Sequence, residues 1–136
     1  MQLNPYLSFD GRCEAAFKFY EKCLGAKMTF KMTFAESPMA AESPPGWENA
    51  IMHAHLSLGD RGIMGSDCPP GRYEKPQGFS ISLSFVDPAE AERVYNAMSE
   101  NGTVFMPLQE TFWALRFGMF VDQFNIPWMI NCEKKH

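Results

Sequence analysis

Residues 79–86 read FSISLSFV, and apolar side chains occupy every second position of this stretch. Such alternation is typical of a β-strand that buries one of its faces. Asp87 and Pro88 follow directly, and this pair predicts a helix with Asp87 as its N-cap and Pro88 at its first position. The remainder of this half predicts three more strands, over Thr103–Leu108, Ala114–Val121 and Pro127–Cys132.

The same order of elements occurs in the first half of the chain. The patterns predict a strand, a helix and three strands, over Leu3–Phe9, Glu14–Leu24, Lys27–Phe34, Ile51–Leu58 and Ile63–Gly65. Leu7-Ser8-Phe9 is echoed by Leu83-Ser84-Phe85 at the same place in the order. We therefore predict a duplicated module within one domain, 1–136, with module one at about 3–65, a linker at 66–78 and module two at about 79–132.

Length and charge exclude several classes of protein. A chain of 136 residues suits one domain, and its net charge of −4 makes nucleic acid an unexpected partner. Its apolar runs fall short of the roughly 20 residues of a membrane span, and Met1–Asp10 lacks the pattern of a secretory signal. The cysteines form no C-x-x-C pair, which favours free thiols in a reducing cytoplasm; they are Cys13, Cys23, Cys68 and Cys132.

Strand alternation also separates two faces of the predicted sheet. In Ile51–Leu58, His53 and His55 share one face, whereas the apolar residues share the other. In the opening stretch, Ser80 and Ser82 lie opposite the apolar positions. Helices cover the apolar face of such a sheet, so the histidine and serine face is expected to line a cleft or to contact solvent.

Two histidines at positions i and i+2 could share a metal ion or a substrate anion. A protein metal site normally recruits a third ligand, and the remaining candidates are three loop carboxylates: Glu36, Glu42 and Glu48. Solvated strand histidines are the plain alternative. We predict no cofactor, with weak divalent-metal binding by His53 and His55 as the alternative, and we assign no catalytic residue.

Three groups of segments resemble the PhnB-like branch of the vicinal oxygen chelate superfamily, which includes glyoxalase I, extradiol dioxygenases and bleomycin- and fosfomycin-resistance proteins. They are Asn4–Phe9 with Ala15–Tyr20; His53–Leu56 with Gly59-Asp60; and Thr111–Trp113 with Arg116–Gly118 and Asp122–Phe124. The resemblance spans almost the whole chain. It departs from the branch at Ala114-Leu115, where Gly-Asp is common, and at Asn125, where Gly is common.

The resemblance implies an α+β fold in which two tandem strand-helix-three-strand modules form a curved mixed sheet. Metal enzymes of the superfamily take one ligand from each of four strands. The matching positions here are Asn4 or Pro5, His55, Ser80 or Ser82, and Met129. Only His55 among them is a good metal ligand, so the resemblance implies a cleft without a complete conventional metal site.

These observations predict a PhnB-like protein that binds a small molecule in the sheet cleft. The expected cleft residues are His53, His55, Ser80, Ser82, Trp113, Arg116 and Met129. The alternative is a metal-dependent enzyme of the superfamily that uses His53 and His55. A single module leaves a sheet edge and a concave face uncovered, and family members pair modules across a twofold axis, so we expect a homodimer.

Overall fold

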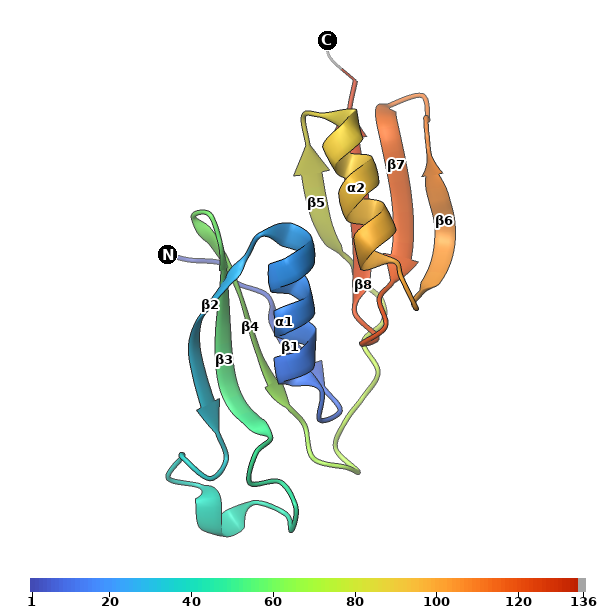
Figure 1. The fold of residues 1–136 in the computed structure, drawn as a ribbon. Coiled ribbons are helices and arrows are strands. Elements are labelled where there is room, and N and C mark those ends of the chain that lie inside the picture. Colours follow the sequence, from blue (N-terminus) through green and yellow to red (C-terminus); the bar gives the residue numbers. More distant parts are fainter. Residues whose placement is uncertain (135–136) are drawn as a thin grey trace. The chain divides into compact units, whose positions relative to one another are not determined.

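The computed structural model describes residues 1–134, which fold into two compact units, each with one α-helix on a four-stranded mixed sheet (Figure 1). The first unit comprises residues 1–74, and the second begins at residue 75. The boundary falls inside the segment predicted as a linker. Both units have the predicted order of strand, helix and three strands, so the repeated architecture is confirmed.

The N-terminal unit has strand order β1-β4-β3-β2, with β1 parallel to β4 and the other pairs antiparallel. Its elements are β1 (Tyr6–Phe9), α1 (Cys13–Leu24), β2 (Lys27–Thr33), the 3₁₀ turn η1 (Ala40–Glu42), β3 (Ile51–Leu58) and β4 (Arg61–Asp67). Strand β4 is longer than predicted because Gly59 and Asp60 alone make the turn, and Leu58 already pairs with Arg61. Gly59 has a φ of 62°, which glycine adopts without steric cost.

The C-terminal unit repeats this topology, with strand order β5-β8-β7-β6 and β5 parallel to β8. Its elements are β5 (Ile81–Phe85), α2 (Pro88–Met98), β6 (Thr103–Gln109), β7 (Ala114–Val121) and β8 (Pro127–Glu133). Asp87 caps α2 as predicted, because its side chain accepts a hydrogen bond from the Ala89 N–H at 3.0 Å. Phe79 and Ser80, expected in the strand, precede it.

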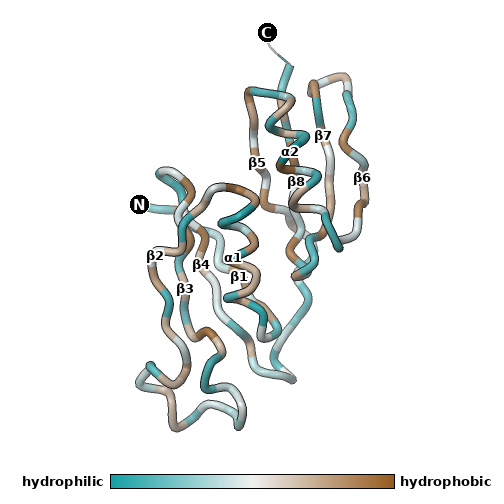
Figure 2. The backbone as a smooth tube through the Cα atoms, viewed as in Figure 1, coloured by the Kyte–Doolittle hydropathy of each residue, from teal (hydrophilic) through white to brown (hydrophobic). Residues whose placement is uncertain are grey.

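Each helix buries one apolar stripe against its own sheet, and hydrophobic and hydrophilic residues alternate along both helices (Figure 2). In α1 the buried residues include Phe17 and Tyr20, and in α2 they are Ala91, Val94 and Met98. In the sheets, the buried residues lie at alternate positions, such as Ala54 and Leu56 in β3 and Trp128, Ile130 and Cys132 in β8. The opposite face of each sheet is left without a helix of its own unit.

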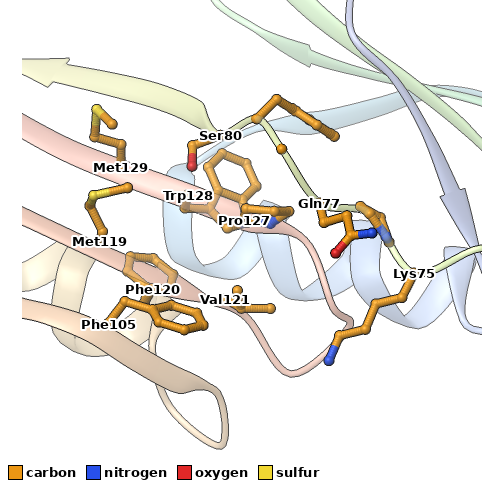
Figure 3. Close-up of a pocket in the computed structure, with 13 residues that line it drawn as sticks. Lys75, Gln77, Ser80, Phe105, Met119, Phe120, Val121, Pro127, Trp128 and Met129 are labelled. Atoms are coloured by element: carbon orange, nitrogen blue, oxygen red, sulfur yellow. The ribbon is translucent and has the colours of Figure 1, made fainter.

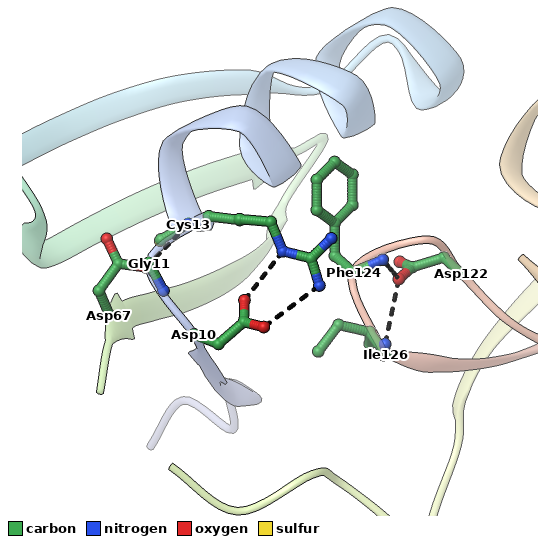
Figure 4. A network of polar contacts seen from close by, with 8 residues as sticks. Asp10, Gly11, Cys13, Asp67, Asp122, Phe124 and Ile126 are labelled. Atoms are coloured by element: carbon green, nitrogen blue, oxygen red, sulfur yellow. Dashed lines mark hydrogen bonds and ion pairs between the residues drawn. The ribbon is translucent and has the colours of Figure 1, made fainter. Parts of the chain in front are cut away.

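A buried carboxylate ties the start of α1 to the end of β4. Asp67 accepts hydrogen bonds from the N–H groups of Gly11 at 3.1 Å and Cys13 at 2.9 Å (Figure 4). It accepts a third from the Ile51 N–H at 2.8 Å. Asp67 therefore caps the start of α1. The residue before the helix, Arg12, makes no side-chain capping bond and forms an ion pair with Asp10. Neither α1 nor α2, in the described part of the chain, has the length and apolar character of a membrane-spanning helix.

Candidate functional site

The two histidines of β3 lie on the helix-free face of the N-terminal sheet, as predicted. Their neighbours Ala54 and Leu56 are buried on the helix side, at 0% and 1% exposure. The ring of His53 stacks on Tyr6, with centroids 5.7 Å apart, and its Nδ1 lies 3.2 Å from the Tyr6 hydroxyl. The ring of Phe30 packs against the same imidazole, with centroids 5.8 Å apart. His53 is therefore held in an aromatic cluster.

His55 has different surroundings on the same face. Its Nδ1 lies 3.3 Å from the Thr29 hydroxyl, and its Nε2 lies above the backbone of Gly62. A Cβ at Gly62 would lie 2.6 Å from that nitrogen, so only glycine leaves room for the ring there. A hollow of about 390 Å³ beside His55 is lined by residues 1–4, Ser57 and the β3–β4 turn.

The histidines do not fit a conventional divalent-metal centre. Within residues 1–134, no three His, Cys, Asp or Glu side chains cluster closely enough to hold a metal ion. Glu36, one of the loop carboxylates considered as a third ligand, accepts hydrogen bonds from the Thr33 backbone N–H and hydroxyl at 3.0 and 2.9 Å. These bonds lower its pKa and fix it in the turn after β2. Two imidazoles alone leave the coordination of zinc incomplete.

The helix-free face of the C-terminal sheet carries a pocket of about 660 Å³ (Figure 3). Strands β6, β7 and β8 form one wall, and the segment that precedes β5 forms the other. The lining residues are Lys75, Pro76, Gln77, Gly78, Phe79, Ser80, Phe105, Met119, Phe120, Val121, Pro127, Trp128 and Met129. Most of them are apolar, and the polar side chains are few.

Strand register explains how the floor of this pocket forms. Met119 of β7 and Met129 of β8 are direct partners, as are Val121 and Pro127, so their side chains share one face. Ser82 of β5 is in turn the partner of Met129. The structure thus brings Ser80, Ser82 and Met129 of the predicted cleft set to one region of the C-terminal unit. Ligand binding by His53 and His55 together with them stays a prediction.

Arg116 does not lie where the sequence analysis placed it. Its Nε donates to a Glu92 carboxylate oxygen of α2 at 2.8 Å, so the side chain is on the helix-covered face. Strand alternation accounts for the difference, because Arg116 and Met119 are three positions apart and must point to opposite faces. The same pattern, applied along 114–121, predicts this orientation from sequence.

Trp113 does not line the pocket either. It precedes β7, is 42% exposed, and contacts the rings of Phe112 and Phe117 edge-on, with centroids at 4.7 and 5.2 Å. Of the residues that line the pocket, sequence reasoning found only Ser80 and Met129, and those it missed include Lys75, Gln77, Phe79, Phe105 and Met119. Strand alternation was a usable signal for Met119 and Val121, which lie two positions apart on one face of their strand.

Two buried polar groups lie near these surfaces. The side-chain oxygen of Asn131, two residues beyond Met129 on β8, is inaccessible to solvent and has no hydrogen-bond partner among residues 1–134. Asp122 closes the β7–β8 turn, where it accepts hydrogen bonds from the N–H groups of Phe124 and Ile126 (Figure 4). Its other oxygen accepts a hydrogen bond from the indole of Trp128 in β8. The Asp122 carboxylate thus binds groups of its own turn and of β8.

Burial shifts the pKa of two side chains in the N-terminal unit, Asp67 and Cys13. Burial raises the pKa of Asp67 above its ordinary value, although its three N–H partners act in the opposite direction. Burial and the nearby Asp67 also raise the pKa of the Cys13 thiol strongly. Cys13 is therefore a packed thiol rather than a nucleophile, since the thiolate is the reactive form.

The chain belongs to the Glyoxalase/Bleomycin resistance protein/Dioxygenase superfamily, whose family model matches residues 2–130. It is 38% identical over 143 residues to Protein YjdN of Escherichia coli (strain K12), and the alignment covers 99% of this chain and 97% of the relative. Protein PA1353 of Pseudomonas aeruginosa is similar in structure, with a TM-score of 0.90, 46% identity and 99% coverage of both chains.

The PhnB protein of Bacillus cereus shares the fold, with a TM-score of 0.79, 20% identity, and coverage of 97% of this chain and 99% of that one. These similarities confirm the family resemblance predicted from the sequence and the two-module α+β fold.

Proposed function

We propose that this protein binds a small, largely apolar molecule in the pocket of its C-terminal unit, without a complete conventional metal site. The single observation that carries the proposal is the concave, helix-free face on which Phe79, Phe105, Met119 and Met129 converge. Pockets of about 300–1,000 Å³ with apolar walls and a few polar groups are typical of small-molecule sites.

The exposure of the aromatic walls supports this proposal. Phe79 is 50% exposed and Phe105 is 70% exposed, so both rings leave apolar surface in water. A bound molecule that covers such surface gains roughly 25 cal/mol for each Å² removed from water. Met119 and Met129 add flexible, polarisable side chains that can adapt to the shape of a ligand.

Titration with the neutral fluorescent probe N-phenylnaphthylamine tests the proposal. We expect saturable binding by the native protein, weakened about tenfold by Met129→Lys, since a charged group would then occupy the apolar floor. Phe105→Ala removes a largely exposed ring and should weaken binding without affecting folding. Met39→Lys is the matched control, because Met39 is 49% exposed and lies in the loop before η1.

Circular dichroism melts of each variant establish that it is folded. Unchanged probe affinity in both pocket variants, with an intact fold, would contradict the proposal.

We also propose that the protein is a homodimer in the cytoplasm. Strands β1 and β2 end one sheet and β5 and β6 end the other, and sheet edges of this kind favour pairing with a further strand. The four cysteines are free, which suits a reducing compartment.

A further inference from the structure

We propose that the C-terminal pocket selects a planar aromatic molecule bearing an acidic group, with the ring against the methionine pair and the acid at Lys75. This inference rests on the proposed function and names the ligand class for the same pocket. Charged, aromatic, sulfur-containing and neutral hydrogen-bonding groups are distributed unevenly around the cavity.

Lys75 is the one charged residue among those that line the pocket. Its ammonium group makes no ion pair within residues 1–134, so its charge is available to a ligand. The chain as a whole carries a net charge of −4 and would repel an acid in general. An acidic ligand therefore needs a local positive charge, and the pocket provides one at its edge.

Among the described residues, the pocket lining contains no carboxylate: neither Glu74, which precedes Lys75, nor Asp122, which follows Val121, is a lining residue. The Asp122 oxygens accept hydrogen bonds from the N–H groups of Phe124 and Ile126 and from the Trp128 indole. Gln77 and Ser80 add neutral polar groups to the same wall as Lys75, and both can donate hydrogen bonds to an acid's oxygens.

The opposite end of the pocket suits an aromatic ring. Figure 3 shows Met119 and Met129 together at one end of the cavity and Lys75 at the other. Thioether sulfurs make favourable contacts with aromatic rings, and rings such as Phe105 pack edge-to-face or offset with another ring. The pocket is thus polarised along its length, apolar and sulfur-lined at one end and cationic at the other.

A matched pair of ligands tests the inference. β-Naphthoate and β-naphthamide have nearly the same shape, but only the first carries a charge. Each would compete with N-phenylnaphthylamine for the native protein and for Lys75→Gln, Lys75→Arg and Lys22→Gln, the last being a control on α1 of the other unit. Melting curves establish that every variant is folded.

We expect the native protein to prefer the naphthoate by about 3- to 5-fold, the range of a partly exposed ion pair. Lys75→Gln should reduce the preference to about one through weaker naphthoate binding alone, whereas Lys75→Arg and Lys22→Gln should keep it. High salt should lower the preference, because it screens the exposed charge. The saturated decahydronaphthoate should bind more weakly than the naphthoate.

Equal affinity for the two naphthalenes, or a preference that survives Lys75→Gln, would overturn the inference about the acid. Equal binding of the saturated acid would overturn the inference about the ring. In either case the proposed function still holds if the native protein binds the probe and Met129→Lys weakens that binding. Absence of probe binding to the native protein would instead remove both.

Discussion

Replacing Asp67 by asparagine should destabilise the protein more than any exposed carboxylate replacement. Both oxygens of Asp67 are used: one accepts from Gly11 and Cys13, and the other accepts from Ile51 at 2.8 Å. An asparagine can keep one oxygen for the first two donors. Its amide nitrogen must then face the Ile51 N–H, donor against donor, in a buried position.

The size of the effect follows from this count of donors. A hydrogen bond to a charged group contributes about 1.5–3 kcal/mol, and leaving a buried donor unsatisfied costs about 1–3 kcal/mol. Removing the buried negative charge offsets part of this loss, since burial disfavours the ionised form of Asp67. We expect Asp67→Asn to lower the free energy of unfolding by about 2–4 kcal/mol at neutral pH.

The pH dependence has a defined sign. The folded pKa of Asp67 is raised, so the part of its stabilisation that comes from proton uptake is present below the unfolded pKa and is lost as pH rises through the folded pKa, whereas the hydrogen bonds of the ionised form remain. Other carboxyl groups titrate alike in both proteins, so the difference between native protein and variant isolates Asp67. That difference should be larger at about pH 4 than at about pH 7.

Urea unfolding followed by circular dichroism at both pH values measures these quantities. Asp60→Asn is the control in the same unit, because the Asp60 side chain is 92% exposed and its contact with Arg61 is long, at 3.8 Å. It should change the unfolding free energy by less than about 0.5 kcal/mol. A loss below about 1 kcal/mol for Asp67→Asn, or a difference that grows with pH, would refute the reasoning.

Three further predictions concern the rest of the molecule. Asn131→Leu removes a buried oxygen that has no partner among the described residues, so thermal melts should show a gain of about 1 kcal/mol; a loss would reveal a partner for that oxygen. Untagged purified protein should contain well under one metal equivalent by elemental analysis, and EDTA should leave its melting temperature unchanged, since His53 and His55 offer two imidazoles only; one equivalent per chain would contradict this. Light scattering at micromolar concentration should give twice the chain mass of 15.5 kDa, and the mass of one chain would exclude the homodimer.

Local patterns in the sequence were sufficient for the elements and for the faces of their side chains. The alternation in Ile51–Leu58 predicted both the bounds of β3 and the placement of His53 and His55 opposite the helix. Asp87 and Pro88 likewise predicted the start of α2. These features depend on contacts between residues a few positions apart, which leave a visible period or cap in the sequence.

Only the tertiary structure decided which distant groups meet. Asp67 caps a helix that begins 54 residues earlier, and Arg116 pairs with Glu92, 24 positions away on α2. The pocket forms because residues 75–78, which have loop composition, and Phe79 and Ser80, which precede β5, lie against the floor made by β7 and β8. Nothing in the local pattern marks Lys75 or Phe79 as a lining residue, because their surroundings are set by how strands pair and how the preceding segment folds onto them.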